Sequence, residues 1–360
     1  MTQTSVPRSQ ANKHSDARTV AESATDGTPS GAASTPSAVP VLRVDKLCVD
    51  LPGRHGSLRA LDGVSFDISA GEVLGVVGES GAGKSLTGAA IIGLLEPPLR
   101  VSSGRILLDG NRIDQLPREE MRRLRGRHIG AIFQDPLTSL NPLFTIGQQL
   151  IETVRFLLGL DAKEARRRAI ELLGEVGIPG ATRRLDAYPH EFSGGMRQRV
   201  VIALALAGNP RLIIADEPTT ALDVSVQAQI IALLKRLCVD HGMAAMLVTH
   251  DMGVIAEIAD RVAVMYAGRV AELGPVRETI TRPCHPYTAG LMGSIPVIGR
   301  RMLHLPQIDG AMPRLGAVPP GCAFNPRCVS AMPRCRNELP QDFVRGATRV
   351  NCWLFHDGLA

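Results

Sequence analysis

The sequence predicts an α/β fold built around a parallel sheet. Residues 212–215 and 245–249 are uninterrupted apolar runs, which are typical of strands covered by helices on both faces. A third apolar run, residues 72–77, leads through a glycine-rich loop into a helix that starts near Lys84. Strands that alternate with helices in this way favour an α/β core.

Composition narrows the class of protein. The 360 residues are 44% apolar and 21% charged, which suits a folded chain with a well-buried core, and the net charge of +5 does not require a polyanionic partner. The longest apolar run, residues 200–207, is far shorter than the ~18 residues that span a bilayer. The N-terminus lacks the pattern of a secretory signal. We therefore expect neither an integral membrane protein nor an exported one.

The first part of the chain predicts a tail and then strands. Residues 1–40 are rich in Ser, Thr, Ala, Pro and Gly and predict a disordered tail, because they offer little to bury. Residues 41–50 and 61–68 predict two strands joined by a glycine-containing turn. Residues 104–109 predict another strand, and residues 117–127 a basic helix.

The rest of the chain divides in two. Residues 150–176 have a helical pattern with Asp161 as N-cap. A further helix begins after Ser193 and ends at the Gly-Asn-Pro sequence that starts at residue 208. Beyond residue 295 proline, arginine and cysteine increase and periodicity fades. We therefore expect a domain over residues 41–295 and a separate Cys-rich appendage over residues 296–360.

A phosphate-binding loop follows the first apolar strand. The sequence GESGAGKS fits the pattern G-x-x-x-x-G-K-[ST], in which backbone N–H groups turn toward phosphate oxygens. Lys84 supplies a charge for the β- and γ-phosphates, and the hydroxyl of Ser85 is suited to Mg²⁺. The following helix directs its positive dipole end at the same anion. The predicted nucleotide-binding residues are Gly78, Glu79, Ser80, Gly81, Ala82, Gly83, Lys84 and Ser85.

Two acids follow the apolar run 212–215. A Mg²⁺–nucleotide site needs a carboxylate at the end of a neighbouring strand, and Asp216 provides one. We expect Asp216 to hold Mg²⁺ through water and Glu217 to act as the general base on the attacking water. The alternative, a surface acidic pair, is disfavoured by the phosphate loop.

Further motifs, in order along the chain, resemble those of the ATP-binding cassette (ABC) ATPases. Residues 191–199 (EFSGGMRQR) resemble the signature sequence of this family. Gln134 lies in a match to the Q-loop, Asp223 in a match to the D-loop, and His250 matches the switch histidine. The resemblance covers residues 41–275.

This resemblance implies a P-loop NTPase fold of the ABC ATPase type. It comprises a RecA-like core, an antiparallel β subdomain and a helical subdomain over about residues 135–210. The sequence is similar, more narrowly, to the D-type subunits of oligopeptide and dipeptide importers over residues 188–199, 216–224 and 285–287.

The resemblance also implies a nucleotide shared between two subunits. A Ser-Gly-Gly turn at a helix start is a second anion site. In the family, this turn in one subunit would cap the nucleotide held by Lys84 of the other. Closure would bring Glu217 and His250 to the γ-phosphate. The capping residues would be Ser193, Gly194, Gly195 and Met196, with Asp223 of the D-loop also at the nucleotide.

Three positions have competing interpretations. The amide oxygen of Gln134 suits Mg²⁺, although a solvated loop residue is the alternative; the family uses the segment after it to touch the membrane partner. The neutral imidazole of His250 can hydrogen-bond the γ-phosphate or the lytic water, although a structural histidine is the alternative. Between Val41 and Gly63 no aromatic residue is available to stack on adenine, and Leu51 and His55 are the nearest substitutes.

The cysteines fall into two groups. Cys48 and Cys238 lie in apolar patterns and are expected to be buried. The C-terminal four fit neither the usual zinc pairs nor the common ferredoxin spacings. Because some members of the peptide-importer subfamily carry a [4Fe–4S] cluster in such a segment, the resemblance implies cluster ligands, with zinc or free thiols as alternatives. These residues are Cys322, Cys328, Cys335 and Cys352.

The function implied by the resemblance is ATP hydrolysis, with Mg²⁺, that energises uptake of peptides by an ABC importer. The subunit would lie peripherally on the cytoplasmic face of the cytoplasmic membrane. Its partners would be transmembrane permease subunits, an extracytoplasmic substrate-binding protein and a second ATPase subunit that forms a heterodimer with it. It would bind neither the peptide directly nor nucleic acid.

Other functions remain open at this point. They are a soluble ABC ATPase acting on DNA, an importer subunit for nickel or another small solute, and a degenerate regulatory subunit. The presence of Lys84, Asp216, Glu217 and His250 argues against the last of these.

Overall fold

The computed structural model describes residues 39–53, 56–220, 222–295 and 307–356. The strands within these residues form a four-stranded sheet, in the order β2-β1-β4-β5, and an eight-stranded sheet, in the order β11-β12-β10-β9-β3-β8-β7-β6. Residues 1–38 of the predicted tail lie outside them. No helix in the part of the chain that is described is both long and apolar enough to cross a membrane.

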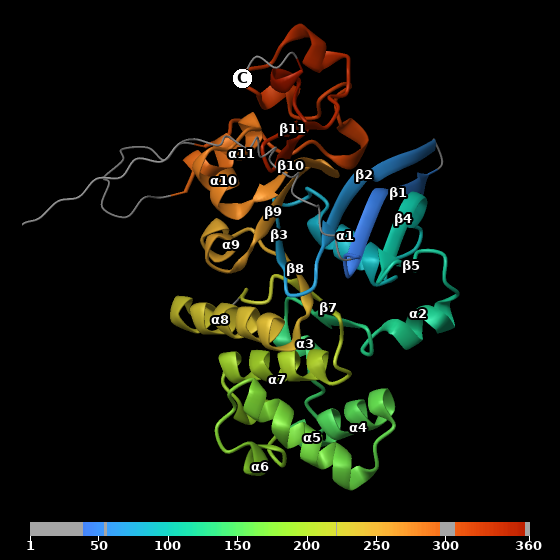
Figure 1. Ribbon diagram of the computed structural model, residues 1–360, viewed down its shortest axis with the longest axis vertical. Helices are drawn as coiled ribbons and strands as arrows, with labels where there is room; N and C mark the ends of the chain where they lie inside the picture. Colours follow the sequence, from blue (N-terminus) through green and yellow to red (C-terminus); the bar gives the residue numbers. More distant parts are fainter. Residues whose placement is uncertain (1–38, 54–55, 221, 296–306, 357–360) are drawn as a thin grey trace, which may run out of the picture. The chain divides into compact units, whose positions relative to one another are not determined.

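The four-stranded sheet is antiparallel. β1 (Leu42–Gly53) pairs with β2 (Gly56–Ile68) on one side and with β4 (Arg100–Leu108) on the other, and β4 also pairs with β5 (Asn111–Arg112). Figure 1 shows β1, β2 and β4 side by side in blue and cyan. Both β2 and β4 begin several residues earlier than the apolar pattern indicates, because their first residues are polar and largely exposed.

The eight-stranded sheet has a parallel centre. β3 (Val73–Val77) lies between β8 (Ala244–Val248) and β9 (Arg261–Tyr266), and β7 (Leu212–Asp216) lies between β8 and β6 (Ile129–Ile132), all in parallel pairs. Every residue of β3 and β8 is buried, as expected for strands covered on both faces. The carboxyl ends of β3, β7 and β8 therefore open at one edge, where ligands of open α/β sheets bind.

One predicted helical pattern, residues 150–176, is divided between two helices. Gly159 adopts a φ of 71° and ends α4, and Asp161 begins α5 by accepting hydrogen bonds from the backbone N–H groups of Lys163 and Glu164, both at 2.8 Å. The α-helices are α1 (Lys84–Ile91), α2 (Arg118–Leu124), α3 (Pro136–Ser139), α4 (Ile146–Leu158), α5 (Ala162–Glu175), α6 (Ala181–Arg184), α7 (Gly194–Leu206), α8 (Val224–His241), α9 (Met252–Ile258), α10 (Val276–Thr281) and α11 (Pro286–Gly293).

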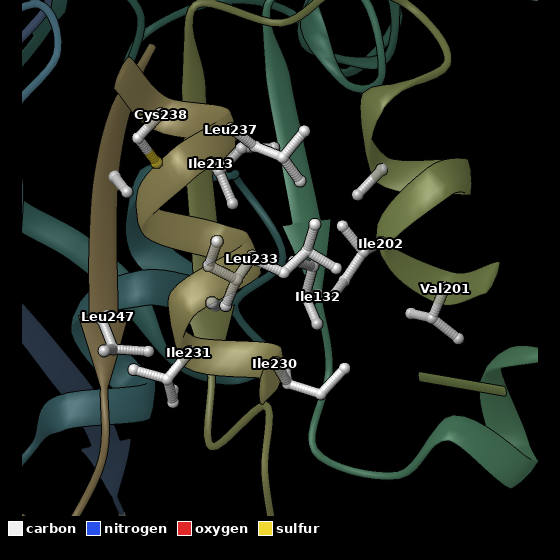
Figure 2. Close-up of a cluster of buried hydrophobic side chains, with 14 of the residues drawn as sticks. Ile132, Val201, Ile202, Ile213, Ile230, Ile231, Leu233, Leu237, Cys238 and Leu247 are labelled. Atoms are coloured by element: carbon white, nitrogen blue, oxygen red, sulfur yellow. The ribbon is translucent and has the colours of Figure 1, made fainter. Parts of the chain in front are cut away.

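An aliphatic core joins helices α7 and α8 to the parallel strands. Figure 2 shows side chains of both helices meeting those of β6, β7 and β8. Cys238 on α8 belongs to this core and Cys48 on β1 is also buried, as the sequence predicts. Burial raises the pKa of Cys238 to about 12, so its thiol is a small apolar group. The labelled residues are Ile132, Val201, Ile202, Ile213, Ile230, Ile231, Leu233, Leu237, Cys238 and Leu247.

The C-terminal residues are not a separate appendage, which corrects the prediction. β12 (Thr348–Val350) pairs with β10 (Arg269–Pro275), and β11 (Phe343–Arg345) pairs with β12, so a short hairpin extends the eight-stranded sheet. Each of the two strands has only three residues, too few for a periodic pattern to reveal them.

The short 3-10 helices are η1 (Pro189–Glu191), η2 (Leu315–Ala317), η3 (Asn325–Arg327), η4 (Pro333–Arg336) and η5 (Trp353–Phe355).

Candidate nucleotide-binding site

The loop between β3 and α1 is shaped by close backbone approaches. A Cβ atom at Gly78, whose φ is 150°, would lie 2.3 Å from the carbonyl oxygen of Met265. One at Gly83, whose φ is 103°, would lie 2.7 Å from a methyl carbon of Leu61. These two positions therefore require glycine. Gly83 is also the N-cap of α1, so the N-terminus of α1 faces the loop.

Lys84 reaches back across this loop. Its Nζ donates hydrogen bonds to the carbonyl oxygens of Gly78, at 2.8 Å, and Glu79, at 3.1 Å. Burial lowers the pKa of Lys84, against the raising effect of the carboxylates of Glu217, Asp216 and Glu79. The ammonium group thus lies among acids and loop carbonyls, in a position to exchange the carbonyls for phosphate oxygens.

Two predicted Mg²⁺ ligands lie next to each other. The Ser85 hydroxyl donates a hydrogen bond to Oδ1 of Asp216 at 3.0 Å, which joins the start of α1 to the end of β7. Burial raises the pKa of Asp216, and the hydrogen bond from Ser85 opposes that shift. A hydroxyl and a carboxylate are hard oxygen ligands of the kind that Mg²⁺ prefers, so this pair fits the ion.

A carboxylate at the centre of the site collects three polar partners. Glu217 Oε2 accepts hydrogen bonds from Nε2 of Gln134, at 3.2 Å, and from the hydroxyl of Thr220, at 2.9 Å. Glu217 Oε1 lies 3.1 Å from Nδ1 of His250. These contacts lie at the carboxyl ends of three neighbouring parallel strands, because Gln134, Glu217 and His250 follow β6, β7 and β8. Gln134 thus contacts Glu217, and its amide oxygen is left for another partner.

The surroundings of Glu217 keep it ionised. Burial raises the pKa of Glu217, but the hydrogen bonds from His250 and Thr220, together with the charges of His250 and Lys84, outweigh burial, and the net pKa is below its ordinary value. The carboxylate is therefore ionised at neutral pH and able to accept a proton. Thr220 has no counterpart in the sequence prediction, since a threonine beside a turn carries no distinctive pattern.

The Ser-Gly-Gly turn lies apart from the phosphate loop. Ser193 is the N-cap of α7, and its Oγ accepts a hydrogen bond from the backbone N–H of Met196 at 3.4 Å. Ser193 and Gly194 are exposed, while Gly195 and Met196 are half-buried. Within the described residues, no hydrogen bond or ion pair joins this turn to residues 78–85. Asp223, the N-cap of α8, is likewise exposed.

The candidate adenine contacts are only partly visible. Leu51 is half-buried in β1 and pairs with Leu58 of β2, which is 42% exposed. His55 lies outside the described residues. The structure thus places a second aliphatic residue, Leu58, beside the turn that has no aromatic side chain, and no motif in the sequence points to it.

The four C-terminal cysteines do not form a ligand group in the described structure. All are free; Cys335 and Cys352 are buried, and Cys322 and Cys328 are half-buried. No group of three or more His, Cys, Asp or Glu residues that could hold a metal ion occurs among the described residues. Burial raises the pKa of Cys352 to about 11, and the charges of the other three thiols add to this rise. Burial also raises the pKa of Cys322 and of Cys328, so these two thiols and that of Cys352 are protonated at neutral pH.

An apolar surface follows Gln134 on the helical part. A groove of about 780 Å³ is lined by Phe133, by Thr138 and Ser139 of α3, and by Phe156 of α4, among others. Leu137 and Leu143 are 61% and 81% exposed. We call this lining the Q-side groove, and its large exposed side chains are Phe133 and Phe156; Leu137, Leu143 and Phe144 are exposed residues of the segment after Gln134 that do not line it.

Comparison with known proteins agrees with this site. The ABC transporter family profile matches residues 61–220, and the profile for the oligopeptide/dipeptide transporter C-terminal region matches residues 271–335. The dipeptide transport ATP-binding protein DppD of Bacillus subtilis is 48% identical over 87% of this chain and 94% of its own length. DppD of Escherichia coli is 46% identical over 83% of this chain and 92% of its own.

A solved structure agrees as well. The dimeric ATP-binding cassette MJ0796, in a post-hydrolysis state with ADP and Pi bound, is 30% identical with a TM-score of 0.58. The similarity covers 66% of this chain and 99% of the other.

Proposed function

Because the chain belongs to the ATP-binding proteins of ABC transporters, in which an ATPase is coupled to transport, we propose that it energises the import of peptides. The predicted ABC ATPase fold is confirmed by the structural similarity. The observation that carries the catalytic part is the contact of Glu217 with Gln134, Thr220 and His250. Support for peptides comes from the C-terminal region profile and from the names of the relatives.

The catalytic proposal assigns a role to each contact. Lys84 would exchange its loop carbonyls for the β- and γ-phosphates. Ser85 and Asp216 would hold Mg²⁺, which would neutralise phosphate charge. Ionised Glu217 accepts the proton of the attacking water. His250, whose side chain is 67% exposed, is free to turn from Glu217 toward the γ-phosphate.

Pairing with a second ATPase subunit completes the site in this proposal. Ser193 and Gly194 are exposed at a helix N-terminus and do not contact the phosphate loop of their own chain. A helix N-terminus with free N–H groups favours an anion, so this turn would cap a nucleotide held by another subunit. The related cassette MJ0796 is dimeric. In this proposal the second ATPase subunit is a different chain, so the pair is a heterodimer.

The Q-side groove gives the proposal a membrane partner. Its occupant would be a cytoplasmic helix of a permease subunit, because large apolar side chains on a surface mark contact sites. Gln134 lies at one end of this segment and touches Glu217, so nucleotide chemistry and permease contact share one loop. The chain would then lie peripherally at the cytoplasmic face, with an extracytoplasmic binding protein that delivers the peptide.

The catalytic assignment is tested with Glu217→Gln in the chain assembled with its permease. We expect Mg-ATP to bind and the steady-state ATPase to fall by at least 100-fold, within the range that a general base contributes. Glu120→Gln, an exposed change on α2, is the control and should keep the wild-type rate. Hydrolysis by Glu217→Gln at the wild-type rate would refute the assignment.

The solute is tested in the same assembly by stimulation of ATPase. Dipeptides and oligopeptides delivered by the binding protein should raise the rate, whereas nickel and sugars should not. If nickel alone stimulated the ATPase, the transported solute would be a metal ion and not a peptide. Tight, salt-sensitive DNA binding without association with permease would favour the soluble ABC ATPase instead.

A [4Fe–4S] cluster on the four cysteines is a finer proposal, with zinc or unligated thiols as the alternatives. The thiols as described do not fit a ligand set, and no catalytic step depends on them. The proposal is supported by the proximity of the four cysteines, because the charges of Cys322, Cys328 and Cys335 all raise the pKa of Cys352. Iron and sulfide analysis after anaerobic purification decides it. Stoichiometric zinc or absence of metal would overturn it.

A further inference from the structure

Glu79, in the phosphate loop, is held by residues that lie far along the chain. The guanidinium Nη1 of Arg327 donates to both carboxylate oxygens of Glu79, at 3.0 and 3.2 Å. The hydroxyl of Tyr287 accepts a hydrogen bond from the backbone N–H of Glu79 at 2.9 Å. Residues of the C-terminal region (271–335) therefore form hydrogen bonds with both the main chain and the side chain of Glu79.

Arg327 is fixed from several sides. Its side chain is only 8% exposed, and its Nε donates to the carbonyl oxygen of Asp309 at 2.8 Å. The guanidinium carbon lies 5.8 Å from the ring centre of Tyr266 and 5.9 Å from that of Phe324. A buried guanidinium with this many partners cannot leave Glu79 without loss of its surroundings.

Tyr287 is held just as firmly. Its side chain is fully buried, and its ring packs edge-on against Tyr266, with ring centres 4.7 Å apart. Phe324 completes the cluster at 5.4 Å from Tyr287. These aromatic contacts fix the Tyr287 hydroxyl, so the position of the Glu79 backbone depends on the packing of the C-terminal region.

The charge on Glu79 matters for a polyanion. The Glu79 carboxylate is close enough to Lys84 for its charge to act on the ammonium group that serves the β- and γ-phosphates. A free carboxylate at this point would repel phosphate. Arg327 compensates that charge, because its Nη1 donates charge-assisted hydrogen bonds to both carboxylate oxygens.

We propose that Arg327 and Tyr287 are positioning residues of the phosphate loop, through which the C-terminal region sets the affinity of the site for Mg-ATP. This inference rests on the nucleotide site of the proposed function. It makes the region around residues 308–328 a part of that site, although it touches no phosphate itself.

The test measures Mg-ATP binding to the full chain by titration calorimetry. Arg327→Gln should raise Kd about tenfold, within the usual range of coupling between sites. The double variant Glu79→Gln/Arg327→Gln should regain most of the lost affinity, because the uncompensated charge is gone. In steady-state assays with the permease, KM should rise for Arg327→Gln while kcat changes less than twofold.

Arg334→Gln is the matched control. Arg334 also lies in the C-terminal region, but it stacks on Trp353 and pairs with Glu338. It should leave Kd within twofold of wild type. A Kd of Arg327→Gln within twofold of wild type, or a double variant that binds no better than Arg327→Gln, would overturn the inference. Wild-type chain that does not bind Mg-ATP would instead overturn the proposed function.

Discussion

The hydroxyl of Thr220 holds the pKa of Glu217 down, and its removal should be visible in the pH dependence of ATP hydrolysis. Thr220→Val keeps the side-chain shape and deletes the hydrogen bond of 2.9 Å to Glu217 Oε2. Burial, which raises the pKa of Glu217, is then opposed by His250 and Lys84 but no longer by Thr220. Glu217 must be ionised to act as a base, so the rate should fall off sooner as the pH is lowered.

The size of this change follows from the geometry. A hydrogen bond to a charged group contributes about 1.5–3 kcal/mol when it is buried. The Glu217 side chain is 20% exposed, so we take the lower end of this range, about 1.5 kcal/mol. The acid limb of the profile of kcat/KM should therefore move to higher pH in Thr220→Val, while the rate at pH 8 stays within twofold.

The assay is ATPase activity between pH 4.5 and 8 for the chain assembled with its permease. Thr219→Val is the matched control, because Thr219 is the neighbouring threonine and makes no hydrogen bond to Glu217. An acid limb that coincides with that of the wild type, or that moves to lower pH, would show that Thr220 does not tune the base.

Other predictions concern stability and the phosphate loop. Burial lowers the pKa of His285 to about 4, so between about pH 6.5 and 4 the unfolded chain binds a proton at this histidine and the folded chain does not. The free energy of unfolding should therefore fall by roughly 3 kcal/mol between pH 7 and 4 because of His285. Urea titrations of His285→Asn should show a flatter pH dependence. Leu247→Ala in β8, at a residue 2% exposed, should lower the free energy of unfolding by about 2–5 kcal/mol in urea, and a loss below 1 kcal/mol would contradict the packing in Figure 2. Gly78→Ala should abolish Mg-ATP binding in calorimetry, because its Cβ would clash with the carbonyl oxygen of Met265; unchanged affinity would refute the required approach. Gly174→Ala on α5 adds a methyl group in open space and should raise the free energy of unfolding by about 0.5 kcal/mol, measured by the urea midpoint.

The strands that are buried on both faces could be predicted from the sequence. β3, β7 and β8 are continuous apolar runs, and the phosphate loop and the acids at the end of β7 have fixed spacings, so pattern alone located them. β6 and β9 were missed. β6 has only four residues, so its apolar run is too short to stand out although the Q-loop match at Gln134 follows it, and β9 has no motif beside it.

Contacts between distant residues could not be predicted in the same way. Arg327 and Glu79 are 248 positions apart, and nothing near either residue indicates the other. The same holds for β12, which pairs with β10 through residues such as Val350 and Glu272. Such pairings depend on how the whole chain folds back, and short strands leave no periodic trace of them. The predicted roles of the nucleotide-site residues remain predictions, although the structure brings Ser85 to Asp216.

The hairpin β11–β12 has a consequence for the integrity of the chain itself. It occupies the hydrogen-bonding edge of β10, a seven-residue strand whose middle residues are buried. A chain cut after Gly293 would expose that edge, and unpaired strand edges template aggregation between copies. In the intact chain the outermost strand is only three residues long and displays Val344 and Arg345 to solvent, a poor template for a second copy. A chain that ends ahead of the hairpin should therefore aggregate more readily than a chain that carries it.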